Sequence, residues 1–198
     1  MTDFATPTVL VTCFSTTCFL AFCWALKGHF HWHGHMPAGM RMLTAMSLVA
    51  FGSFLAGCSD GSLGSLWPCA IISFTGSLAL FTWTLRATRR TRLTVAFSED
   101  RPTFLLRKGP YRYVRHPFYS AYLLFWFGSA VASAGYASWA AAVAIAFVYW
   151  LASNQEEEKF SHSELAEAYA AYRAVTGRFI PCIPWIMRIP AISENAHV

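Results

Sequence analysis

Charged residues are scarce in this chain. Lys, Arg, Asp and Glu make up 13% of its 198 residues, whereas a soluble domain usually has about 25%. Hydrophobic residues account for 56% and the mean hydropathy is +0.39. This composition excludes an ordinary soluble domain and predicts a membrane protein, and the length suits a single domain.

Several common functional motifs are also missing. No GxGxxG follows a strand-like segment, which argues against a Rossmann dinucleotide-binding domain. No two cysteines have the CxxC spacing of a metal or redox site, so we expect reduced, buried thiols. The six are Cys13, Cys18, Cys23, Cys58, Cys69 and Cys182. The first apolar run lacks the basic start of a signal peptide, since Asp3 is its only early charge, and we expect it to be a helix of the mature protein.

Long charge-free runs dominate what is present. They extend from Phe4 to Leu26, Met42 to Ser59, Gly61 to Leu85 and Phe118 to Gln155. A spanning helix needs about 20 apolar residues, and small residues near Gly135 divide the overlong fourth run into a hairpin. The sequence predicts an all-α integral membrane protein with five transmembrane helices and a cytosolic C-terminal helix and tail. The expected single domain covers 1–198, with transmembrane helices at about 5–26, 42–59, 64–85, 117–133 and 136–154.

Positive charge is concentrated in one predicted loop. This loop carries Arg86, Arg89, Arg90, Arg92, Arg101, Arg107, Lys108, Arg112 and Arg115, and the opposite side has only Asp3 and Asp60. The positive-inside rule then places the basic loops and the C-terminus in the cytoplasm, and we expect a plasma (inner) membrane location. Topology and contact with anionic membrane lipids account for the net charge of +5, so no nucleic-acid partner is predicted.

The segment from Arg107 to Tyr122 has the densest mixture of basic and aromatic residues. Proline restricts the residue before it, so a helix should begin at Pro117 with His116 in non-helical backbone. The free amides of such a helix start can meet an anionic group. The same residue types also suit a simple anchor at the membrane interface, where arginine snorkels and tyrosine lies at headgroup level.

Three consecutive carboxylates, Glu156, Glu157 and Glu158, follow the last apolar run. They lie near the negative end of a helix dipole and beside an anionic leaflet, so we expect a compensating positive group. The basic loop and a cationic ligand are both candidates. A further helix through about Val175 should end at Gly177, before an apolar tail.

The second half of the chain resembles a known family. Arg115-His116-Pro117-Phe118-Tyr119, preceded by GPYRYV and followed about forty residues later by a Glu pair, is similar to the integral-membrane methyltransferases. That group includes isoprenylcysteine carboxyl methyltransferase and the phospholipid N-methyltransferases. The stretch from Tyr169 to Pro181 resembles the end of the same pattern. The resemblance covers roughly residues 100 to 185 and implies cytosolic cofactor-binding elements at 100–122 and 155–185.

The resemblance implies that S-adenosylmethionine is the cofactor. The residues that would form its pocket are Gly109, Tyr111, His116, Pro117 and Tyr119, with Glu157 and Glu158 at its amino-acid part. Counting back from Tyr169 favours this Glu pair, although the triplet leaves the register open by one. Ala121 stands where relatives commonly have glycine beside the cofactor.

The acceptor chemistry adds three candidate catalytic residues. Arg173 and Arg178 are expected partners of an anionic acceptor, and a Glu such as Glu157 is the base that an amine acceptor would need. We expect a polar opening for the cofactor under the basic loop. An apolar opening for a lipophilic substrate should lie near Phe118 and Trp126.

The predicted function is methyl transfer from S-adenosylmethionine to a membrane-embedded or lipophilic acceptor, either an isoprenylcysteine-like carboxylate, a phospholipid amine or a thiol. One alternative is an NADPH-dependent reductase of the sterol type, although the Glu pair would repel a polyanionic cofactor. The other is a non-catalytic metal-binding protein that uses the alternating histidines of His29 to His35. No carboxylate or cysteine accompanies those histidines, so no metal site is predicted.

Overall fold

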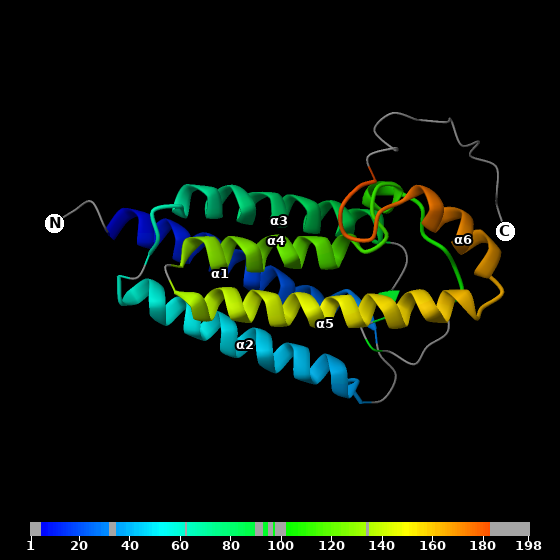
Figure 1. Cartoon of the computed structure of the whole chain (residues 1–198), viewed down its shortest axis with the longest axis horizontal. Helices are drawn as coiled ribbons and strands as arrows, with labels where there is room; N and C mark the ends of the chain where they lie inside the picture. Colours follow the sequence, from blue (N-terminus) through cyan, green and yellow to red (C-terminus); the bar gives the residue numbers. More distant parts are fainter. Residues whose placement is uncertain are drawn as a thin grey trace.

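The computed structural model of this protein describes residues 5–31, 35–61, 63–89, 93–94, 97, 102–133 and 135–182. Within these residues the chain is almost entirely helical (Figure 1). The elements in order are α1 (Ala5–Gly28), β1 (Phe30–His31), α2 (Ala38–Ser59), α3 (Trp67–Ala87), β2 (Leu93–Thr94), the 3-10 helix η1 (Gly109–Arg112), α4 (Pro117–Ala132), α5 (Tyr136–Ser161) and α6 (Ala166–Val175). The two strands have two residues each and pair in parallel. The predicted all-helical class is confirmed.

Helices α1 to α5 run lengthwise through the molecule, and α6 lies at one end of the bundle (Figure 1). In the described part of the chain, α1, α2, α3 and α5 are long and apolar enough to cross a membrane. Such helices make this an integral membrane protein. Helix α4 has 16 residues, fewer than the roughly 20 of a full crossing. The count of five spans therefore stays a prediction.

Two helix boundaries differ from the expected ones and affect the site. Helix α2 begins at Ala38, after Pro37, so Arg41 lies in its first turn instead of before it. Helix α5 continues to Ser161, whereas its transmembrane part was expected to end near 154. The three glutamates therefore belong to one uninterrupted helix.

Helix α4 is held closely against α3. Two buried serine hydroxyls donate across the pair, from Ser73 to the Leu124 carbonyl at 2.7 Å and from Ser77 to the Ala121 carbonyl at 2.6 Å. A side chain at Gly128 would come within 2.9 Å of the Phe74 ring. Small residues and hydroxyls are what membrane helices use to approach one another, because lipid supplies no hydrophobic drive between them. This contact fixes the position of the α4 N-terminus.

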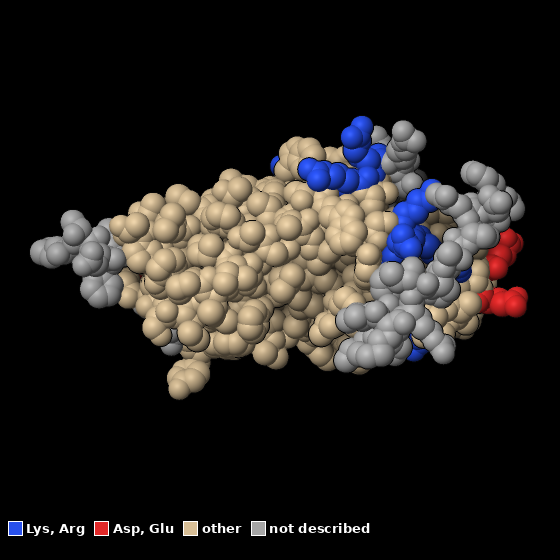
Figure 2. Space-filling view, turned by 90° about the horizontal axis from the view of Figure 1, so that it is seen from above, with Lys and Arg blue, Asp and Glu red and all other residues tan. Residues whose placement is uncertain are grey.

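Among the described residues on the face shown in Figure 2, Lys, Arg, Asp and Glu side chains gather toward the end of the molecule that carries α6. The segments that follow α1 and α3 are joined at this end, where Phe30 pairs with Leu93. The polar segments that we expected on one side of the membrane thus share one end of the bundle (Figure 1).

Candidate functional site

A cavity of about 700 Å³ extends from the charged end into the helix bundle. This volume is typical of small-molecule sites, which measure about 300–1,000 Å³. The wall residues come from α1, β1, α2, the segment 102–106, η1, the residues 115–116 before α4, α4, α5 and α6. They are Phe19, Phe22, Cys23, Leu26, Phe30, Met40, Leu43, Thr44, Ser47, Leu48, Pro102, Thr103, Phe104, Leu105, Leu106, Tyr111, Arg115, His116, Phe118, Tyr119, Tyr122, Trp126, Tyr149, Glu156, Lys159, Phe160, Tyr169 and Tyr172. The charged residues and most tyrosines lie in one part of the wall, and the part between α1 and α2 is mostly apolar, with Thr44 and Ser47 as its hydroxyl-bearing residues.

Glu157 is the centre of a buried ion-pair network behind the polar part. Its side chain is 5% exposed. Oε1 accepts from Arg115 Nε at 3.0 Å and lies 3.2 Å from His116 Nε2. Oε2 accepts from Arg178 at 3.0 Å, and Arg173 Nε lies 3.8 Å away. A buried carboxylate needs such partners, because desolvation of an unpaired charge is costly.

The same network fastens the segment after α6 to the basic loop. The Arg115 amide donates to the Gly177 carbonyl at 2.8 Å, and the His116 amide donates to the Arg178 carbonyl at 3.1 Å. The Arg115 guanidinium also donates to the Thr176 carbonyl at the end of α6. Gly177 has no room for a side chain, since a Cβ would overlap the Ile180 carbonyl.

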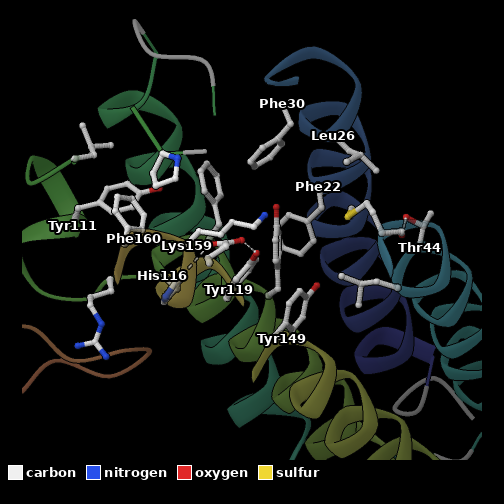
Figure 3. Close-up of a pocket in the computed structure, with 18 of the residues that line it drawn as sticks. Phe22, Leu26, Phe30, Thr44, Tyr111, His116, Tyr119, Tyr149, Lys159 and Phe160 are labelled. Atoms are coloured by element: carbon white, nitrogen blue, oxygen red, sulfur yellow. Dashed lines mark hydrogen bonds and ion pairs between the residues drawn. The ribbon is translucent and has the colours of Figure 1, made fainter. Parts of the chain in front are cut away.

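Glu156 forms a second carboxylate site, on the cavity wall. The Tyr119 hydroxyl donates to its Oε1, and its Oε2 lies 3.3 Å from His116 Nδ1. The His116 ring stacks on Tyr119 with a centroid distance of 5.4 Å. Figure 3 shows His116 and Tyr119 side by side on this wall.

His116 bridges the two carboxylates, with one ring nitrogen facing each. Both nitrogens can donate only in the imidazolium form. Burial disfavours that charged form, but hydrogen bonds and charge attraction from Glu156 and Glu157 outweigh burial and raise the pKa of His116. The bridge therefore favours a positive histidine.

Tyr111, His116 and Tyr119 lie on the cavity wall, as the resemblance implied for a pocket. The other three cofactor-site candidates before α5 do not line it. Gly109 has a φ of +58°, and a Cβ there would come 2.7 Å from the Ala87 Cβ, so it lets η1 pack on α3. Pro117 is buried at the start of α4, and Ala121 packs with Phe81 and Phe118.

Among the glutamates, Glu156 faces the cavity and Glu158 is exposed. Within one helix, residues two apart point about 200° away from each other, so both cannot face the same wall. Glu157 lies behind Arg115 and His116. The geometry thus differs from the expected Glu157–Glu158 pair and brings Glu156 and Glu157 to the site.

Arg173 and Arg178 also lie elsewhere than expected for acceptor partners. Both are paired with Glu157, and neither is among the cavity residues. Arg178 additionally donates to the side-chain oxygen of Asn154. The Arg173 contact joins α6 to α5, and the Arg178 contacts hold the chain after α6 in place.

Sequence reasoning missed Lys159, Phe160, Tyr149 and Tyr122 as wall residues. The sequence spacing indicated two of them in part. Glu156 follows Tyr149 by seven residues and Phe160 follows Glu156 by four, so the three side chains share one helix face. Tyr169 packs its ring on Phe160 at a centroid distance of 4.6 Å. Its buried hydroxyl has no hydrogen-bond partner among the described residues.

Part of the histidine-rich segment lies outside the described residues, including His33 and the side chain of His31. His29 Nε2 lies 2.8 Å from the Thr88 hydroxyl. In the parts of the chain that the structure describes, no group of three His, Cys, Asp or Glu residues could hold a metal ion.

Comparison with known proteins gives one family. The family model described as phospholipid methyltransferase matches residues 67–170, more than half of the chain. The match includes α3, η1, α4, α5 and the first turn of α6. A search of curated proteins found no match. The chain belongs to the phospholipid methyltransferase family and is a membrane methyltransferase.

Proposed function

We propose that this protein transfers a methyl group from S-adenosylmethionine to a lipophilic acceptor within the cavity. The observation that carries the proposal is the combination of a carboxylate-and-aromatic wall with an apolar part between α1 and α2. A polar donor and a lipid-like acceptor need these two surroundings in one continuous space. Family membership supports the type of reaction.

The residues at the polar part fit the proposed donor. A sulfonium cation is favoured by a carboxylate and by aromatic faces, and Glu156 and the tyrosine pair Tyr119 and Tyr149 provide these. The unpartnered Tyr169 hydroxyl is a second indication, because a buried polar group without a partner costs about 1–3 kcal/mol. A ligand with polar atoms at this position would remove that cost.

The proposed roles of the chain's residues follow from their positions. Glu156 would hold the positive part of the donor, with Tyr119 and His116 orienting its carboxylate. Glu157 would not touch the donor directly, since it is buried behind Arg115 and His116 and does not line the cavity. It would instead fix the wall on which the donor rests.

When bound, S-adenosylmethionine supplies an electrophilic methyl group on sulfur. The chain's own residues need only hold the acceptor in line and exclude water, and no protein nucleophile is required. With an amine acceptor a proton must also leave, and Glu156 is then the candidate base on the cavity wall. With a thiolate or carboxylate acceptor no base is needed.

The proposed orientation places the charged end of the molecule at the cytoplasmic face of a plasma (inner) membrane. In that orientation α4 would complete a bundle of five spans. The polar part of the cavity would then receive the donor from the cytosol. The apolar part, walled by Phe22, Leu43 and Leu48 among others, would lie at membrane depth and receive the acceptor.

The test is incubation of the purified protein with radiolabelled S-adenosylmethionine and total membrane lipid. We expect label in the lipid fraction, and a loss of at least about 10-fold in the Glu156→Gln variant, as for removal of a charged contact. Glu158→Gln is the matched control, because Glu158 is exposed on the same helix turn. Absence of lipid labelling by folded wild-type protein, or equal labelling by Glu156→Gln, would contradict the proposal.

A further inference from the structure

Residues 102–106 form an irregular part of the cavity wall at the charged end of the molecule. All of them line the cavity, and the chain then enters η1. Figure 1 shows this stretch in green, crossing the end of the bundle beside α6. Thr103 and Phe104 are exposed, so here the wall is a stretch of chain in contact with solvent and not a packed helix.

The backbone of this segment is weakly held. Within the described part of the chain, no amide or carbonyl of residues 102–106 forms a hydrogen bond with another backbone group. The wall opposite is made by the regular helices α5 and α6. Exposed segments with few backbone hydrogen bonds open at a lower free energy than packed helices. Residues 102–106 are therefore where the wall can open most readily.

Arg107 fastens the end of this segment to α6. Its guanidinium donates to the Ala168 carbonyl at 2.6 Å and lies 5.7 Å from the centre of the Tyr172 ring. Arg107 is exposed and does not line the cavity. Charge-assisted hydrogen bonds and cation–π contacts are modest in strength at exposed positions. The contact with α6 can therefore break and form again without unfolding the protein.

The chain is firmly fixed immediately after Arg107. Gly109 packs on Ala87, where a side chain would not fit, and the Tyr172 hydroxyl donates to the Tyr111 carbonyl at 2.6 Å. Residues 102–106 thus adjoin an anchored turn, with a breakable contact between the two. This is the arrangement of a hinged cover.

We propose that residues 102–106 are a gate at the charged end of the cavity and that Arg107 is the latch that holds this gate closed against α6. A polar ligand enters and leaves when Arg107 releases Ala168. The inference rests on the proposed function for the identity of that ligand, which is the methyl donor or its demethylated product. Arg107 is a positioning residue, because it acts through the gate and lies outside the cavity.

A latch outside the ligand site should change binding rates without changing affinity. Loss of the latch favours opening by the same factor whether the cavity is empty or filled. In stopped-flow fluorescence, Arg107→Gln should increase both the association and the dissociation rate constants of S-adenosylhomocysteine by about 3–10-fold, as for loss of one net hydrogen bond. The dissociation constant should stay within about two-fold of the wild type. A purely structural role would instead accelerate dissociation alone and weaken binding.

A second assay needs no donor. Cys23 is partly buried on the cavity wall, in the last two turns of α1. With the protein in lipid nanodiscs, the water-soluble reagent 2-sulfonatoethyl methanethiosulfonate should reach Cys23 through the open gate. Mass spectrometry should show Cys23 labelled about 3–10-fold faster in Arg107→Gln than in the wild type. Cys182, which does not line the cavity, should be labelled at the same rate in both proteins.

Two control variants make the result specific to the latch. Lys108→Gln removes a neighbouring exposed charge that does not line the cavity, and it should match the wild type in both assays. Arg107→Lys keeps a cation near Tyr172 but lacks the guanidinium fork, so its rates should lie between those of the wild type and Arg107→Gln.

The outcomes separate the gate from the proposed function. Equal labelling of Cys23 in the wild type and Arg107→Gln would overturn the gate, whether or not S-adenosylhomocysteine binds. Faster dissociation with unchanged association would make Arg107 a support of the bound ligand and would also overturn it. Faster Cys23 labelling in Arg107→Gln, together with no binding of S-adenosylhomocysteine by the folded wild type, would contradict the donor and leave the gate standing.

Discussion

Replacing Glu157 with glutamine tests whether the ion-pair network holds the site together. The change keeps the size of the side chain and removes its charge. Arg115 and His116, each 9% exposed, would lose the anion that compensates them. Removing one partner of a buried pair costs about 3–5 kcal/mol. Two partners are partly compensated, because Glu156 still faces His116 and Arg178 is 23% exposed and can turn toward water. We therefore expect the free energy of unfolding to fall by about 3 kcal/mol, the lower end of this range.

For a chain of this length, 1 kcal/mol lowers the melting temperature by about 2–4 °C, so Glu157→Gln should lower it by about 6–12 °C. The assay is thermal unfolding in detergent, followed by intrinsic fluorescence. Glu158→Gln is the control and should change stability by less than about 0.5 kcal/mol, because its side chain is exposed. A Glu157→Gln variant that melts within about 2 °C of the wild type would refute the argument that buried charge pairing fixes this wall.

Three further predictions concern neighbouring residues. The folded-state pKa of His116 is raised, so its stabilising effect is complete below about pH 6.5 and is lost as the pH rises through the folded pKa. The melting temperature of the wild type should therefore fall as the pH rises from about 6.5 through the folded pKa. The melting temperature of His116→Gln should not show the same fall. Gly177→Ala should displace the segment after α6 and destabilise by about 1–3 kcal/mol in the same unfolding assay, since a Cβ overlaps the Ile180 carbonyl; an unchanged melting temperature would exclude this. Tyr119→Phe should leave the fold intact and weaken S-adenosylhomocysteine binding by about 3–10-fold in calorimetry, since Glu156 loses its hydroxyl partner; unchanged affinity would remove Tyr119 from the proposed site.

The helical fold could be predicted because charge-free runs of membrane length are visible directly in the sequence. The α4–α5 hairpin is the least obvious part, and it was indicated only by small residues near Gly135. The glutamate register was not predictable from composition. It depends on α5 continuing through the polar residues to Ser161, and a change of sequence character does not by itself end a helix.

Residues within one motif could be placed together from the sequence, but their partners from distant segments could not. His116 and Tyr119 lie together because they are close in sequence, at the start of a helix that proline fixes. The pairing of Glu157 with Arg115 and Arg178 joins segments 42 and 21 residues apart, and no local pattern encodes it. Lys159 was read as part of a polar stretch, because its direction toward the cavity is set by tertiary packing.

The most direct measurement of the central claim is calorimetric titration of S-adenosylhomocysteine into the wild type, Glu156→Gln and Glu158→Gln. If Glu156, Tyr119 and His116 form the donor site, the wild type and Glu158→Gln should bind with equal affinity. Glu156→Gln should bind at least about 10-fold more weakly. No binding by the folded wild type, or the same affinity in all three proteins, would contradict the account.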